Sequence, residues 1–282
     1  WDSITNSSYD EIDETDRDRA RQFISDFKES KSTIGVGKNP GPSVRDALAN
    51  SKQIFRKEGL DGLSNIVWNI KRQSRRKIMS KYAKRKYHSY EESIDIINSS
   101  NYVFYPIQYY LESRVAMRAP AFFEQSWLIE FLSRSVPVGH DLIVKDHPQR
   151  MGALPKKAVD TISEYATPLS PSVSAHDVIQ NASAVVTLNN TVGYESVMYG
   201  KPVISLGESI YDAYTTKVGD INTLDERIAT AIESGGLDES EVIEFTNGLL
   251  NGSRKGVWRD KSADNVRNIV ENYISVLEQQ DS

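Results

Sequence analysis

Three polar segments of this chain each follow a short apolar run, and their residue types suit the binding of an anionic group. The clearest is "VVTLNNTVGYE" (185–195), where Asn-Asn-Thr separates an expected strand from an expected helix. The first turn of a helix has free N–H groups and a positive dipole end, which favour phosphate or carboxylate. We expect the Thr191 hydroxyl to cap this helix and Gly193 to let a ligand approach its first turn closely. An ordinary capped turn without a ligand is the alternative, and this loop alone does not separate the two.

The second segment is "VKDHP" (144–148), which places His147 at the end of an expected strand. Pro148 prevents the strand from continuing. A histidine there can donate to a phosphate oxygen or a base carbonyl, and Lys145 adds a positive charge. Strand alternation turns Lys145 to the face opposite Asp146. A lone surface histidine is the plainer interpretation, but two anion-suited loops at one sheet edge favour a site.

The elements that position these loops alternate between strand and helix from residue 101 onward. "YVFYP" (102–106) is an aromatic and β-branched run typical of a buried strand, and residues 108–114 follow it as the third polar segment. Helices of about 10–15 residues between strands indicate βαβ units and a parallel sheet. The carboxyl ends of such strands form the ligand-binding edge. Four or five strands are expected, at 102–106, 141–148, 168–170, 184–188 and 203–206.

The fold class is therefore α/β, a Rossmann-like parallel sheet flanked by helices. We expect a helix-rich N-terminal region over residues 1–100 and the sheet domain, closed by C-terminal helices, over residues 101–282. In the last helix Val266, Ile269, Val270, Tyr273, Ile274 and Leu277 share one face. "SAHDVIQNA" (174–182) is expected to begin with a capping box between Ser174 and Asp177.

Composition excludes several classes of protein. The 282 residues have a formal net charge of −5 and no cysteine, so a nucleic-acid partner, a disulfide framework and a thiolate metal site are not indicated. No apolar run approaches the ~20 residues of a membrane span, so a soluble globular chain is the default, and we expect it in the cytoplasm. The chain begins at Trp1 rather than Met, so we expect a fragment or processed product with something missing upstream.

The three segments in this order resemble the capsular polysaccharide biosynthesis family, which includes bacterial β-Kdo transferases of the GT-B glycosyltransferase fold. The resemblance covers about residues 101–214: the family's His-Pro pair falls on His147 and Pro148, and its small-residue loop on 188–195. Thr191, Gly193 and Glu195 fit that loop, whereas Asn189 and Asn190 depart from it. The family's Gln…Glu-Ser/Thr stretch falls on Gln108, Glu112 and Ser113.

The resemblance implies an inverting, metal-independent transfer from a nucleotide-activated sugar to a glycan or glycolipid acceptor, in the C-terminal half of a GT-B enzyme. No separate cofactor and no metal site are expected. Glu112 is the best local candidate for the catalytic base. The residues implied to bind the donor are Gln108, Ser113, Arg114, Lys145, His147, Pro148, Asn190, Thr191, Val192, Gly193 and Glu195. There are two alternatives to these donor-binding roles. Glu195 would only interact favourably with the helix dipole, and Ser113 and Arg114 would only form a solvated loop.

Two other functions stay open at this point: a teichoic-acid-type polyol-phosphate transferase, and a non-catalytic module that binds nucleotide or glycan. A separate feature is Lys71–Lys86, which has nine basic residues in "KRQSRRKIMSKYAKRK". This stretch could contact an anionic membrane at its inner face, or an acidic glycan. A solvated helix face is the commoner meaning of such a charge run.

Overall fold

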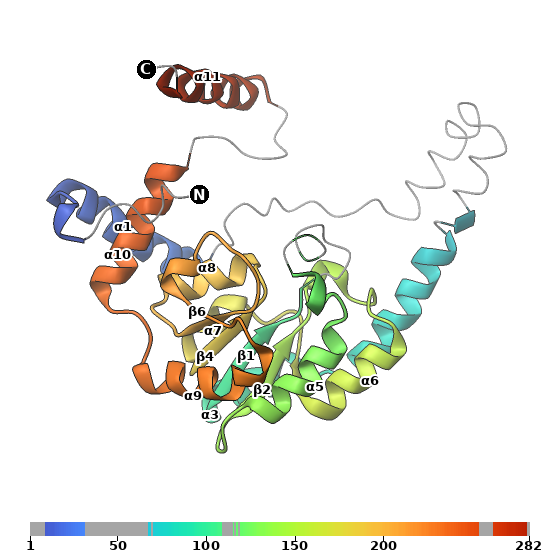
Figure 1. The fold of residues 1–282 in the computed structure, drawn as a ribbon. Helices are drawn as coiled ribbons and strands as arrows, with labels where there is room; N and C mark the ends of the chain where they lie inside the picture. Colours follow the sequence, from blue (N-terminus) through green and yellow to red (C-terminus); the bar gives the residue numbers. More distant parts are fainter. Residues whose placement is uncertain are drawn as a thin grey trace.

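The computed structural model describes residues 9–31, 67–68, 70–108, 115, 117, 119–253 and 262–280. Its centre is one six-stranded parallel sheet (Figure 1). The strand order is β3-β2-β1-β4-β5-β6, and every neighbouring pair is parallel. The strands are β1 (Tyr102–Pro106), β2 (Asp141–Lys145), β3 (Thr167–Leu169), β4 (Ala184–Thr187), β5 (Val203–Ser205) and β6 (Thr216–Lys217).

This sheet confirms the predicted Rossmann-like α/β class. Each of the five expected strands is present, and β6 is an additional one that the sequence did not indicate. β6 has two residues, both polar, so it has neither the length nor the apolar alternation by which a strand is recognised. One strand end was also wrong: β2 ends at Lys145 and not at Pro148.

Helices cover both faces of the sheet. On one face, α5 (Gln125–Ser135), α6 (Lys156–Tyr165) and α9 (Leu224–Ser234) pack against Val103 and Val144. On the other, α3 (Tyr90–Ser99), α7 (Ala175–Asn181) and α8 (Thr191–Met198) cover Phe104 and Ile143. Side chains of a strand alternate between faces, so both sides of the central strands are apolar and buried.

Helices from both ends of the chain pack onto this body. Phe27 of α1 (Glu14–Ser30) and Phe245 of α10 (Glu239–Gly252) form a third apolar cluster with Val197 and Met198 of α8. Residues 70–84 are helical and contact α6 through Ala83. Short 3-10 turns lie at Tyr9–Glu11, Pro120–Phe122, Pro148–Arg150, Asp212–Tyr214 and Ile221–Thr223. The predicted boundary at residue 100 stays a prediction.

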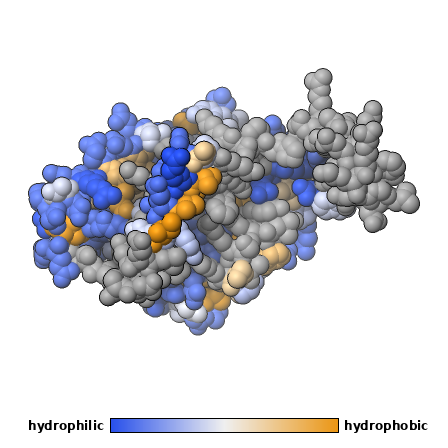
Figure 2. Space-filling model, turned by 90° about the horizontal axis from the view of Figure 1, so that it is seen from above, coloured by the Kyte–Doolittle hydropathy of each residue, from blue (hydrophilic) through white to orange (hydrophobic). Residues whose placement is uncertain are grey.

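The last helix, α11 (Ala263–Gln280), confirms the amphipathic pattern at the C-terminus. It stands apart from the body in Figure 1, and Figure 2 shows a stripe of apolar side chains on it beside hydrophilic ones. Exposed apolar residues of this stripe are Val266, Ile269, Val270, Tyr273 and Ile274. Within the described part of the chain, no helix is both long and apolar enough to cross a bilayer.

One local expectation about capping was wrong. Ser174 does cap α7, but its hydroxyl accepts from the His176 N–H at 3.3 Å, and the helix has no capping box. Asp177 instead forms an ion pair with Lys31, which follows α1. This pair joins α7 to the N-terminal helix, so the acidic residue serves a tertiary contact that local spacing does not reveal.

Candidate functional site

The strand order reverses direction at β1. From β1 the chain first adds β2 and β3 on one side, and then returns to place β4 on the other side. In open α/β sheets the carboxyl ends of the two strands at such a reversal diverge and leave a crevice for ligands. The three predicted segments follow β1, β2 and β4, so they all begin at this edge of the sheet.

Gln108 and Asn189 join two of these segments across the reversal. The Gln108 side-chain amide donates to Asn189 Oδ1 at 2.9 Å, and both residues are buried. The Asn190 amide also approaches the Pro106 carbonyl at 3.5 Å. The loops after β1 and β4 are therefore held together, and Gln108 lies at the centre of the predicted site.

Gln125, the first residue of α5, holds Gln108 in place through hydrogen bonds to its backbone. Its side-chain carbonyl accepts from the Tyr105 hydroxyl and from the Gln108 backbone N–H, each at 2.8 Å. Its amide donates to the Gln108 backbone carbonyl. Gln125 was missed in the sequence because a glutamine at a helix start has no distinctive pattern. Its buried position is what gives it this role.

Asn190, and not the predicted Thr191, caps α8. Its Oδ1 accepts from the Gly193 N–H at 3.3 Å and from the Thr187 hydroxyl at 3.0 Å. The cap lies one residue earlier than expected because an Asn side chain reaches the third amide of the helix as well as a Thr does. Thr191 and Val192 form the partly exposed first turn at the crevice.

Gly193 has a structural role that differs from the predicted one. A Cβ built there would lie 2.2 Å from the ring and the hydroxyl oxygen of Tyr211. The Tyr211 hydroxyl donates to the Asn190 carbonyl at 3.0 Å, and its side chain is buried. The expectation that a ligand approaches Gly193 closely was therefore wrong, because the space beside the glycine is filled by this ring.

Replacing Gly193 with alanine should lower the free energy of unfolding by about 1–3 kcal/mol, because the methyl group overlaps the Tyr211 ring. Chemical denaturation of the variant measures this loss. In a Tyr211→Ala background the same substitution should cost much less, since the ring is gone. An equal cost in both backgrounds would contradict the packing described here.

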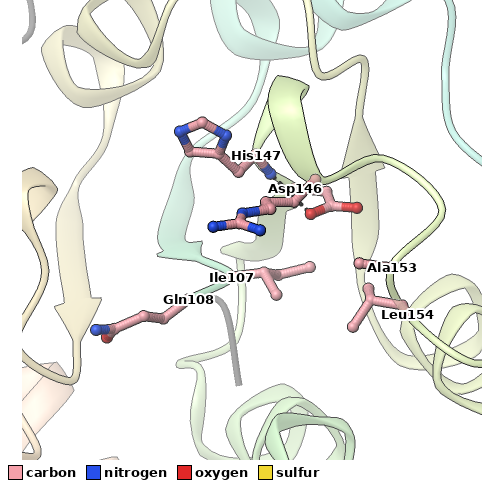
Figure 3. A pocket seen from close by; sticks show the side chains of 7 residues that line it. Ile107, Gln108, Asp146, His147, Ala153 and Leu154 are labelled. Atoms are coloured by element: carbon pink, nitrogen blue, oxygen red, sulfur yellow. Dashed lines mark hydrogen bonds between the residues drawn. The ribbon is translucent and has the colours of Figure 1, made fainter. Parts of the chain in front are cut away.

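His147 lies on the surface at the end of β2. Its backbone N–H donates to Asp146 Oδ1 at 2.7 Å, and Pro148–Arg150 forms a 3-10 turn that ends the strand pairing. The His147 side chain is exposed, as is Pro148. In Figure 3, His147 and Gln108 lie on one side of a small pocket, and Ala153 and Leu154 lie on the other. The residues that line it are Ile107, Gln108, Asp146, His147, Arg150, Ala153 and Leu154.

Lys145 and Asp146 turn to opposite faces, as strand alternation predicts. Lys145 is on the Ile143 face, beneath α8, where Glu195 is also buried. Burial lowers the pKa of Lys145 to about 8, although Asp146 and Glu195 oppose this. Burial raises the pKa of Glu195 to about 8, with Lys145 acting against the rise. Near pH 7 Lys145 is thus mostly charged and Glu195 mostly neutral, which leaves a buried positive charge on this face of the sheet, while the ionised Asp146 lies on the other face.

Asp146 is the buried acid on the pocket side. Burial raises its pKa to about 6, against the effects of the His147 N–H, Lys145 and Arg76. Among the described residues, no group donates to its second oxygen, Oδ2, or to Oε1 of Glu195. Unsatisfied buried carboxyl oxygens of this kind are costly and are often found at functional sites.

A second element missed in the sequence is the helix at 70–84, which supports the His147 loop. Arg76 Nε donates to the Met151 carbonyl at 3.2 Å. Gly152 has a φ of +80°, and a Cβ there would lie 2.1 Å from the Arg76 carbonyl oxygen. Only glycine allows this contact, so the helix backbone lies directly against the loop that carries His147.

Three of the predicted site residues, Glu112, Ser113 and Arg114, lie outside the described residues. The structure brings together Gln108, His147, Pro148 and the Asn190–Gly193 loop at one sheet edge. It places Lys145 and Glu195 beneath that edge.

The region that contains all of these features has a counterpart among known families. Residues 58–223, more than half of the chain, match the family described as capsule polysaccharide biosynthesis protein. This chain belongs to that family. The matched range includes all six strands, Gln108, the His147 loop and α8.

Relatives of this family member are distant. Protein FixF of Sinorhizobium fredii (strain NBRC 101917 / NGR234) is 26% identical over 228 residues, which cover 75% of this chain and 50% of FixF. The chain thus spans about half the length of this curated relative.

Two solved structures, both from Thermosulfurimonas dismutans KpsC, are similar at low TM-scores. The β-Kdo 2,4 transferase is 14% identical, with a TM-score of 0.43 over 84% of this chain and 56% of that one. The β-Kdo 2,7 transferase is 18% identical, with a TM-score of 0.37 over 62% of each chain. The family assignment depends on the match at 58–223 and not on these structures.

Proposed function

We propose that this chain is the donor-binding part of a glycosyltransferase of surface-polysaccharide synthesis, which binds the phosphate of a nucleotide-activated sugar. The observation that carries the proposal is the hydrogen bond between Gln108 and Asn189 across the strand-order reversal. It joins the loops after β1 and β4 at the point where open α/β sheets bind ligands. Gln108 also lines the pocket beside His147, so both loops and the histidine belong to one site.

The chemical task of this site is to stabilise a departing nucleotide phosphate. Negative charge develops on that group as the bond to the sugar breaks, and pre-positioned donors lower the barrier. His147 and the first-turn amides of α8 would supply donors at the surface of the crevice, and the charged Lys145 would act from beneath. Glu195, protonated near pH 7, would be free to hydrogen-bond a ribose or sugar hydroxyl. An inverting transfer to a glycan or glycolipid also requires a base, for which Glu112 remains our candidate.

The rival enzyme is a polyol-phosphate transferase, because its nucleotide-bound donor presents the same phosphate to the same loops. A non-catalytic nucleotide- or glycan-binding module is the other alternative, because the same loops could bind a phosphate or a glycan without transferring a sugar.

Titration calorimetry with CMP, UDP, GDP and CDP separates the two transferases from each other and from a module that binds only glycan. We expect one nucleotide to bind clearly better than the others. Preference for CMP favours a Kdo-like donor, and preference for CDP favours the polyol-phosphate transferase. If none of the four binds, the transferase proposal fails and a glycan-binding module is favoured.

A further inference from the structure

The basic helix that supports the His147 loop presents a cationic surface to the outside. Residues 70–84 are helical, and a turn continues to Lys86. Eight of the nine basic residues between Lys71 and Lys86 are exposed, and Arg76 alone turns inward. No acidic residue interrupts the stretch. Among the described residues, none of the eight exposed cations forms an ion pair.

The charge of this surface is opposite to that of the whole chain. The net charge of the protein is −5, although this one stretch contributes nine positive charges. Charges of both signs spread over a protein surface keep the protein soluble and largely cancel each other's repulsion. A single-sign block whose exposed cations form no ion pair with a described residue instead attracts an anionic partner.

Exposed apolar side chains lie among these cations. Ile78 is 68% exposed and Ile70 is 40% exposed, and Trp68, which is 57% exposed, stacks beneath the Arg72 guanidinium at 4.9 Å. Apolar and aromatic side chains flanked by Lys and Arg are typical of helices that lie in a membrane interface. A soluble polyanion has no apolar part that could contact an exposed isoleucine, whereas a bilayer has one. The combination of cations and apolar side chains therefore favours a lipid surface.

The inward side of the helix fixes its orientation. Tyr82 donates to Asp160 of α6, and Ala83 and Tyr87 pack with Val159. Figure 1 shows this helix in cyan at one side of the body, next to α6 and directed away from the sheet. The helix is therefore held by its apolar inward face while the cationic face stays free to contact a flat surface.

We propose that the exposed face of residues 70–86, with Trp68, docks this protein on an anionic lipid bilayer. The proposal does not depend on the nucleotide site. Each basic residue held near an anionic surface raises the affinity roughly fivefold, so Lys77, Lys81 and Lys84, which share one side of the helix, would together raise it about a hundredfold. Because Gly152 and Met151 contact the same helix, docking would place the His147 pocket close to the bilayer.

Vesicle flotation with the unaltered chain tests this directly. We expect association with vesicles of phosphatidylcholine and phosphatidylglycerol, and none with phosphatidylcholine alone. The association should weaken strongly between about 0.1 M and about 1 M salt, where the Debye length falls from about 10 Å to about 3 Å. Absence of binding to the anionic vesicles at low salt would overturn the proposal.

Matched variants locate the surface. Replacing Lys77, Lys81 and Lys84 with glutamine should weaken vesicle binding by more than tenfold. Replacing Arg134, Arg227 and Arg267 with glutamine removes the same charge from elsewhere and should have little effect. An equal loss in both triple variants would show that net charge alone attracts the vesicles, and would contradict the assignment to this helix.

Ile78→Ser separates a lipid surface from a soluble acidic glycan. We expect the substitution to weaken vesicle binding several-fold without a change in charge, and to leave the circular dichroism spectrum unaltered. If Ile78→Ser has no effect, and a soluble acidic polysaccharide competes fully with the vesicles, the partner is a polyanion and the membrane proposal is wrong.

Discussion

Replacing Gln125 with leucine should lower the free energy of unfolding by about 3–5 kcal/mol, because it leaves three buried groups without their partner. The groups are the Tyr105 hydroxyl and the backbone N–H and carbonyl of Gln108. Each unsatisfied buried group costs about 1–3 kcal/mol, while leucine recovers part of the lost packing. Urea denaturation of the variant measures the change.

A double-mutant cycle with Tyr105→Phe is the control for this prediction. Without the Tyr105 hydroxyl, Gln125→Leu leaves one buried group fewer without a partner. The loss of unfolding free energy caused by Gln125→Leu should therefore be smaller by about 1 kcal/mol or more. The same cost in both backgrounds would mean that the hydrogen bond to Tyr105 contributes nothing. The anchoring of Gln108 is tested by the single variant, because a cost well below about 3 kcal/mol would mean that the Gln108 backbone groups do not depend on Gln125.

Replacing Glu195 with glutamine should remove a loss of stability between pH 6 and pH 8. The pKa of Glu195 is raised to about 8 in the folded chain by burial, from an ordinary value of 4.5. The folded state therefore binds more protons than the unfolded state between these values, and stability falls as pH rises through the window. The loss from pH 6 to pH 8 should be about 2 kcal/mol for the unaltered chain.

This window isolates Glu195 from its buried neighbours. The pKa of Asp146 is about 6, so most of its contribution lies below the window and only about 0.4 kcal/mol remains above pH 6. The pKa of Lys145 is lowered to about 8, so stability gained from its deprotonation appears mainly above the window. We expect the pH 6–8 slope to fall to a small remainder in Glu195→Gln and to persist in Glu164→Gln, which alters an exposed glutamate of α6. A persistent slope in Glu195→Gln would show that this carboxyl is ionised or paired in the fold.

The sheet could be predicted from the sequence because its strands are apolar runs separated by helices of regular length. "YVFYP" and "AVVT" are buried along their whole length, so their composition alone marks them. The edge strand β6 could not be predicted, since Thr216 and Lys217 gain their pairing from β5 and not from any pattern of their own.

The candidate site was predicted in outline and not in detail. His147 and Asn190 were found because loops after parallel strands converge on one edge. The partners that position them, such as Gln125, Tyr211 and Arg76, come from distant parts of the chain and are ordinary residues in their local context. Gly193 shows the limit most clearly: a glycine in a helix start suggests ligand approach, and only the fold shows that Tyr211 fills the space.

The most direct test of the account compares two histidines at the two ends of β2. His147 follows the strand at the proposed site, whereas His140 precedes it at the opposite edge. Calorimetry with the preferred nucleotide should show binding about tenfold weaker or more for His147→Ala, in line with the loss of a hydrogen bond to a charged group of about 1.5–3 kcal/mol. His140→Ala should bind as the unaltered chain does. Equal affinities for all three proteins would contradict the claim that the His147 loop binds the nucleotide phosphate.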